Sequence, residues 1–194
     1  MLPLFSSPLP AVRASAAGVF ADVVTHCGPS GGPFLPPCLP HLLAGCRSPS
    51  AALRQACAFG LGMAATCDSF APASHDAAAA LVDAASAPCG ERDTDAKHAR
   101  DNALSAIARA LEARPSLHAP AAVDALVNGL PLESDLEEAV AAHAGVARMV
   151  AARDPRFAAH AQRLRAAFAA CASRPGLVDA DTAATMAALL ATSP

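Results

Sequence analysis

The stretch FGLGMAATC (Phe59–Cys67) has counterparts about every 40 residues along the chain. Similar helix-like blocks occur at VFADVVTHC (Val19–Cys27), IARALEARP (Ile107–Pro115), VARMVAARD (Val146–Asp154) and MAALLATS (Met186–Ser193). The steps from one start to the next are 40, 48, 39 and 40 residues. A period of this size is typical of solenoids in which pairs of antiparallel helices stack side by side. Because each pair buries its apolar face against its neighbours, stacking creates an extended curved surface that usually binds other proteins.

The composition fits an all-α protein. Hydrophobic residues make up 54% of the 194 residues, largely because alanine is abundant, and there are seven Phe but no Trp or Tyr. Alanine is the best helix former, because it loses no side-chain entropy when a helix forms. No run alternates between apolar and polar residues over the length of a strand. We therefore predict an all-α, right-handed solenoid of HEAT repeats, with about four antiparallel helix pairs and one leading unpaired helix.

Turn signals divide the chain into one array that covers residues 1–194. Proline, glycine and helix-capping residues place the repeats roughly at 9–27 (a half repeat), 34–67, 70–114, 119–153 and 155–192. A charged loop expected at 87–96 accounts for the longer second step. Ser50 is expected to cap the helix that follows it, and Ser134 with Glu137 forms the S-x-x-E pattern of a capping box.

Charge and cysteine content disfavour several classes of partner. The net charge is −3, whereas a nucleic-acid-binding protein usually carries a basic stripe. The most apolar stretch, residues 48–66, contains Arg54 and is better explained as a buried helix than as a membrane span. The seven cysteines form no CxxC pair, which favours free thiols in a reducing compartment. We therefore expect no nucleic-acid or membrane partner, and localisation to cytoplasm and nucleus.

The sequence carries no recognisable catalytic motif. The nucleotide-binding pattern GxxxxGK[ST], the hydrolase pattern GxSxG and the zinc pattern HExxH are all missing. Cysteine and histidine are dense only between His26 and Cys46, where their spacing does not match a zinc site. We therefore expect no enzyme activity, no catalytic residue, no bound metal and no cofactor.

Several stretches, in their order, resemble the karyopherin-β (importin-β) family of nuclear transport receptors. They are VFADVVTHCGP (Val19–Pro29), LRQACAFGLGMAA (Leu53–Ala65), RDNALSAIARALEARP (Arg100–Pro115) and LVNGLPLESDLEEAVAAHAGVARMV (Leu126–Val150). The same order occurs in the C-terminal HEAT-repeat segment of receptors of the importin-β-3 (Ran-binding protein 5) and importin-4 type. The resemblance covers residues 19–155 and departs from the family at Asn128-Gly129, where those receptors have a Trp.

The resemblance implies a segment of a receptor that binds cargo proteins for nucleocytoplasmic import. The expected partners are proteins with basic localisation signals. In such receptors Ran and the first nucleoporin contacts belong to N-terminal repeats, so we expect these partners only through a longer parent protein. The alternative is a HEAT-repeat adaptor or scaffold for protein–protein interaction that is unrelated to transport.

Candidate cargo-binding residues lie near the starts of the second helices of two pairs. Asp101 and Asn102 match a Glu-Asn pair of the family, and an Asn amide can bind an extended peptide backbone; the structural alternative is that they cap the helix and a neighbouring turn. The densest acidic cluster consists of Glu133, Asp135, Glu137 and Glu138. This cluster can attract a basic signal or simply complement a helix dipole. Arg54 is expected to make a structural contact between repeats.

Overall fold

The computed structural model describes residues 1–192, which form helices and their connections. The α-helices are α1 (Leu2–Phe5), α2 (Pro10–Cys27), α3 (Leu35–Cys46), α4 (Ala51–Ala64), α5 (Ser74–Ala85), α6 (Thr94–Ala113), α7 (Pro120–Gly129), α8 (Leu136–Ala151), α9 (Ala161–Ala172) and α10 (Ala180–Ala191). Short 3-10 helices lie at η1 (Gly28–Phe34), η2 (Asp68–Ala73) and η3 (Pro155–His160). No strand occurs within residues 1–192, so the predicted all-α class is confirmed. The last predicted block, Met186–Ser193, ends one residue outside the described residues.

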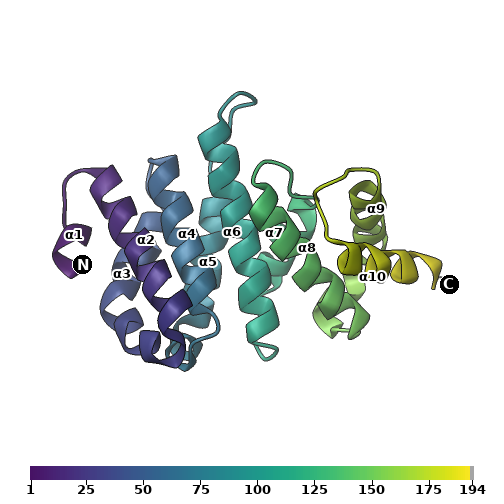
Figure 1. Cartoon of the computed structure of the whole chain (residues 1–194), viewed down its shortest axis with the longest axis horizontal. Coiled ribbons are helices and arrows are strands. Elements are labelled where there is room, and N and C mark those ends of the chain that lie inside the picture. Colours follow the sequence, from purple (N-terminus) through teal and green to yellow (C-terminus); the bar gives the residue numbers. More distant parts are fainter. Residues whose placement is uncertain (193–194) are drawn as a thin grey trace.

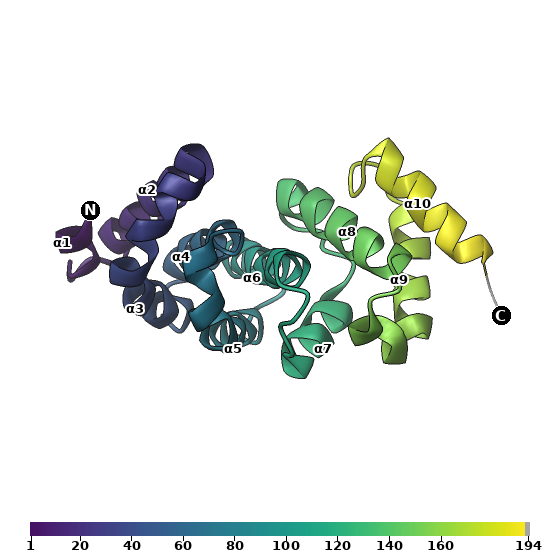
Figure 2. The same ribbon diagram turned by 90° about the horizontal axis from the view of Figure 1, so that it is seen from below.

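The helices are stacked side by side in the order of the chain, in two rows, and together they form an α-solenoid (Figure 1). The inner row consists of α2, α4, α6, α8 and α10, and the outer row of α3, α5, α7 and α9 (Figure 2). Successive helices of the inner row pack directly on one another. Figure 2 shows that the inner row curves, with α2 and α10 bent toward the same side. The inner row therefore lines the hollow side of the array.

Helix α6 is the central helix of this arrangement. Every residue from Asp101 to Ala108 is buried, because α4, α5, α7 and α8 all pack against α6. Leu104, Ile107 and Leu111 follow the i, i+3, i+7 spacing of one helix face and are at most 1% exposed. Burial of each such side chain contributes roughly 1.5–3 kcal/mol to stability. Because α6 contacts both halves, it fixes the position of the helices on either side.

The structure confirms one predicted helix start and shifts two others. Ser50 caps α4, and its side chain accepts a hydrogen bond from the Leu53 N–H at 3.4 Å. The capping box predicted from Ser134 and Glu137 is wrong, because the N-cap of α8 is Asp135, one residue later. The charged loop is shorter than the predicted range 87–96, because Asp93 caps α6 and the helix begins at Thr94.

The predicted unpaired leading helix corresponds to α2, and a short helix that was not predicted, α1, lies before it. Phe5 at its end is 4% exposed, and its ring stacks on His41 with 5.1 Å between the ring centroids and 9° between the planes. The α1 helix thereby covers part of the end of the array. Leu2, Leu4 and Leu9 remain exposed around it.

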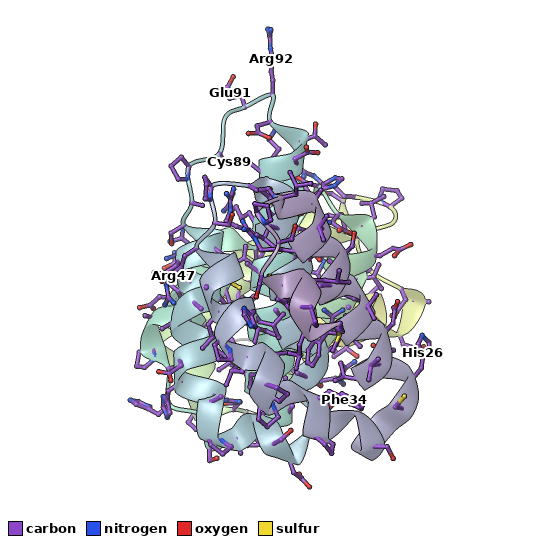
Figure 3. The ribbon with its side chains drawn as sticks, turned by 90° about the vertical axis from the view of Figure 1, so that its left-hand side faces the viewer. His26, Phe34, Arg47, Cys89, Glu91 and Arg92 are labelled. Atoms are coloured by element: carbon purple, nitrogen blue, oxygen red, sulfur yellow. The ribbon has the colours of Figure 1, made fainter. Side chains whose placement is uncertain are left out.

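Most cysteines behave as small apolar residues, as the sequence predicts. The buried ones are Cys38, Cys46, Cys57, Cys67 and Cys171. Burial raises the pKa of the Cys57 thiol to about 12 and that of Cys171 to about 11, so both are protonated at neutral pH. Cys27 and Cys89 are exposed, and Cys89 lies with Glu91 and Arg92 on the loop that projects beyond the helix ends (Figure 3).

Gly62 allows α4 and α6 to approach each other closely. A β-carbon at position 62 would lie 2.9 Å from Cβ and 3.0 Å from Cα of Ala106. Neither atom can move away without a shift of α6. We therefore expect Gly62→Ala to lower the free energy of unfolding by about 1–3 kcal/mol, measured by urea denaturation.

The matched control is Gly18→Ala in α2. A β-carbon there would meet nothing within 4 Å, so only the helix propensity changes. We expect this variant to be neutral or more stable by up to about 1 kcal/mol. Equal effects of the two substitutions would contradict the close approach of α4 and α6.

Candidate partner-binding surface

Asp101 joins α6 to the turn that leads into α8. Its Oδ2 accepts hydrogen bonds from three successive backbone N–H groups, those of Glu133 (3.2 Å), Ser134 (2.7 Å) and Asp135 (3.1 Å). Hydrogen bonds to a charged acceptor contribute about 1.5–3 kcal/mol each, more than those between neutral groups. Since Asp101 is 6% exposed, water competes little for this carboxylate. The position and direction of the chain at the start of α8 are therefore set by α6.

Neighbouring side chains complete the same junction. The Asn102 amide donates to the His98 carbonyl (3.0 Å) and to Oδ2 of Asp135 (2.8 Å), the residue that caps α8. Glu138, in the first turn of α8, accepts two hydrogen bonds from the Arg109 guanidinium at 2.7 and 3.1 Å. Helix α6 thus binds three parts of the junction: the backbone that precedes α8, the residue that caps α8, and the first turn of α8.

His143 connects the same turn to the last repeat. Its Nε2 accepts from the Leu132 N–H at 3.1 Å, and its Nδ1 lies 2.8 Å from the Leu177 carbonyl oxygen. An N–H can only donate and a carbonyl can only accept, so the ring must be neutral and protonated on Nδ1. Burial lowers the pKa of His143, and this outweighs the hydrogen bond to Leu177 and the charge of Asp101, which raise it. Three segments therefore meet at one neutral histidine.

Two arginines in successive repeats bind the carbonyl groups that end the preceding inner-row helix. Arg114 donates to the carbonyls of Ala65 (3.1 Å) and Cys67, just after α4. Arg156 donates to those of Leu111 (2.8 Å) and Arg114 (3.1 Å), at the end of α6. These bonds satisfy carbonyl groups at the C-terminal ends of α4 and α6. Each arginine also joins one repeat to the next.

Arg54 does not make the contact between repeats that the sequence predicts. It is buried, and its Nη1 donates to the carbonyls of Ser48 (2.8 Å) and Pro49 (3.0 Å), in the turn before its own helix. Three arginines that the sequence analysis missed do form hydrogen bonds between repeats: Arg109, Arg114 and Arg156. The available signal for two of them was position: Arg114 lies near the end of the block IARALEARP, and Arg156 lies two residues after the block VARMVAARD.

The structure divides the six predicted cargo-binding residues into a buried and an accessible set. Buried in the junction are Asp101, Asn102 and Glu138. Asp135 is half-buried and caps α8, whereas the Glu133 side chain is 48% exposed and pairs with Arg174. Glu137 is exposed and has no hydrogen bond or ion pair within residues 1–192. Cargo binding stays a prediction for all six, but only Glu133 and Glu137 present carboxylates to a partner without rearrangement.

The hollow side also carries paired charges. Arg109 lies over the Phe59 ring of α4, 5.8 Å from its centroid, while it binds Glu138 of α8. One turn further along α6, Glu112 accepts two hydrogen bonds of 2.6 and 3.0 Å from Arg148 of α8. Because these charges neutralise each other, the middle of the inner row has little net charge.

Comparison with known families agrees with this architecture. A family model described as a HEAT-like repeat matches residues 10–63, which hold α2, η1, α3 and most of α4. No curated protein sequence matches the chain. The helical solenoid and the repeat match together support an α-solenoid with HEAT-like repeats.

Two further properties apply to residues 1–192. None of the helices there is both long and apolar enough to cross a lipid bilayer. Over the same range, no group of three or more His, Cys, Asp or Glu side chains is placed to hold a metal ion.

The geometry of His143 makes stability depend on pH. Its folded-state pKa is lowered, whereas an unfolded histidine titrates near pH 6.5, so the unfolded chain binds the extra proton more readily. Stability from this group is therefore complete above about pH 6.5 and is lost as the pH falls through the folded-state pKa. Arg156 lowers the pKa of Asp154, and the Thr182 N–H lowers that of Asp179, so these carboxylates lose their contribution only at more acid pH.

We expect urea denaturation of the wild type to show falling stability as the pH is lowered below about 6.5. His143→Gln is the matched variant, because a glutamine amide can accept from Leu132 and donate to Leu177 without titrating. The variant should show a shallower dependence on pH over this range. The same slope in both proteins would contradict the role assigned to His143.

Proposed function

We propose that the chain binds a partner protein along its inner row of helices, as a segment of an importin-β-like receptor for cargo with basic localisation signals. The observation that carries the binding role is the curved inner row itself, which offers one continuous surface over five helices. The transport role is supported by the ordered stretches between Val19 and Val150 that resemble karyopherin-β receptors. The stretches that resemble the receptors overlap four of the five helices of the inner row, α2, α4, α6 and α8.

The accessible carboxylates at the start of α8 supply the chemistry for a basic signal. Glu137 has no partner within the described residues, and Glu133 is held only by an exposed ion pair with Arg174. Exposed ion pairs contribute about 0–1 kcal/mol, so a lysine or arginine of a partner can replace Arg174 at little cost. We call the exposed pair Glu133 and Glu137 the acidic edge. The buried carboxylates of Asp101 and Glu138 lie beneath the acidic edge and hold it in place.

The alternative is an adaptor that holds a protein partner and has no part in transport. The HEAT-like repeat match supports this alternative as well as it supports a receptor, because both use helical repeats to bind proteins. An adaptor predicts a stable partner whose binding is indifferent to Ran. A pull-down from cell lysate with the longer parent protein, with and without GTP-locked Ran, separates the two: release by Ran supports the receptor, and no response supports the adaptor.

The acidic edge is tested with a lysine-rich localisation-signal peptide and fluorescence anisotropy. We expect Glu133→Gln combined with Glu137→Gln to weaken binding about threefold to tenfold at low salt, because two charges that attract the peptide are lost. The control is Asp22→Asn combined with Asp76→Asn, which makes the same change in net charge at exposed positions of α2 and α5. If both pairs leave the affinity of the peptide unchanged, the acidic edge is not the binding site.

A further inference from the structure

We propose that the N-terminal end of the array binds an anionic group, a carboxylate or phosphate, carried by a partner protein. The site is a pocket of about 280 Å³ between α1, α2, α3 and the turn that follows α3. Its polar lining consists of Arg13, His41 and Ser48, and the rest of the lining is apolar. No acidic side chain lines it. This site lies away from the acidic edge at α8 and does not depend on the cargo proposal.

Charge is distributed unevenly along the chain in a way that favours an anion here. The only acidic residue before Asp68 is Asp22, whereas this part of the chain contains Arg13, Arg47 and Arg54. The whole chain nevertheless carries a net charge of −3. Figure 3 views the array from this end and labels Arg47, which directly precedes Ser48 in the turn. Arg47 pairs with Asp83 of α5 at 2.6 Å, so the positive charge of this end comes from Arg13 and Arg54. A locally positive end on an otherwise acidic protein attracts anionic partners.

Two guanidinium groups at this end have no carboxylate partner within residues 1–192. Arg13 is half-buried, and its one hydrogen bond runs from Nη1 to the Ser7 carbonyl at 2.9 Å. Arg54 is 7% exposed, binds only the carbonyls of the Ser48–Pro49 turn, and leaves its Nε without an acceptor. A buried charge without a counter-ion is unfavourable. An anion bound in the pocket would compensate the charge of Arg13, which lines it.

The donors around the pocket suit a small anion. Arg13 retains most of its guanidinium N–H groups for a fork-shaped interaction with a carboxylate or phosphate. The Ser48 hydroxyl oxygen accepts from the Ser50 N–H at 3.2 Å, so its own hydrogen is free to donate. The stack on Phe5 fixes the plane of the His41 ring, which has no hydrogen bond within the described residues. Phe5 and Leu53 supply apolar contacts for the carbon atoms of a bound side chain.

The test follows backbone and arginine side-chain NMR signals of the whole chain during titration with three probes. These are inorganic phosphate, N-acetyl-phosphoserine amide and N-acetyl-glutamate amide. We expect saturable shifts at Arg13 and Ser48 with at least one of the amide probes. Tighter binding of the phosphoserine probe identifies a phosphorylated partner, and equal or tighter binding of the glutamate probe identifies an acidic one.

The variant Ala44→Glu blocks the pocket without removal of its arginine. Ala44 lines the pocket and is exposed, so a glutamate there can occupy the anion's place beside Arg13. We expect its affinity for the probes to fall about tenfold or more, which is the loss of one charge-assisted hydrogen bond. The control is Ala169→Glu, an exposed position of α9 that makes the same change in net charge.

Arg13→Gln is a second variant and should give the same loss, with thermal melting used to confirm that it remains folded. Failure of all three probes to give saturable shifts in the wild type would overturn the proposal. Equal affinity in the wild type and Ala44→Glu would also overturn it, because binding would then lie elsewhere.

Discussion

The middle of the array depends on the hydrogen bonds that the buried carboxylate of Asp101 accepts. One oxygen accepts from three successive backbone N–H groups of the turn that leads into α8. Leu132 anchors the first part of that turn in the core, and polar bonds to α6 set the course of the three residues that follow it. Asn102 and Arg109 add bonds to the cap and the first turn of α8. A charged residue that looks like a surface feature in the sequence is therefore an internal support.

The curved inner row follows from this kind of support. Helix packing alone leaves the angle between neighbouring repeats adjustable, because alanine-rich faces offer few interlocking side chains. Hydrogen bonds from Arg114 and Arg156 to the ends of preceding helices, together with His143 between two turns, fix that angle. A surface held in one shape costs less entropy when a partner binds. The proposed binding role therefore rests on polar contacts between repeats as much as on the apolar core.

The sequence predicts the local features of this fold well and its long-range contacts poorly. Proline, glycine and capping residues act over a few positions, which is why the start of α4 after Ser50 is predicted correctly. Asp101 is singled out in the sequence as a binding or capping residue; it binds a neighbouring turn, but the cap of its own helix is Asp93. The partners of Arg54 and His143 depend on which turns come together in space, and no local pattern specifies that. The pocket at Arg13 is hidden for the same reason, because its lining comes from distant parts of the chain.

The most direct test of the central claim is amide hydrogen exchange at Glu133, Ser134 and Asp135 in the native protein. These residues lie outside any helix, yet the account predicts that they exchange as slowly as buried amides of α6, because Asp101 holds them. Protection should be lost in Asp101→Ala while that of α4 is retained. Exchange in the wild type as fast as in the projecting loop at residues 87–93 would contradict the account.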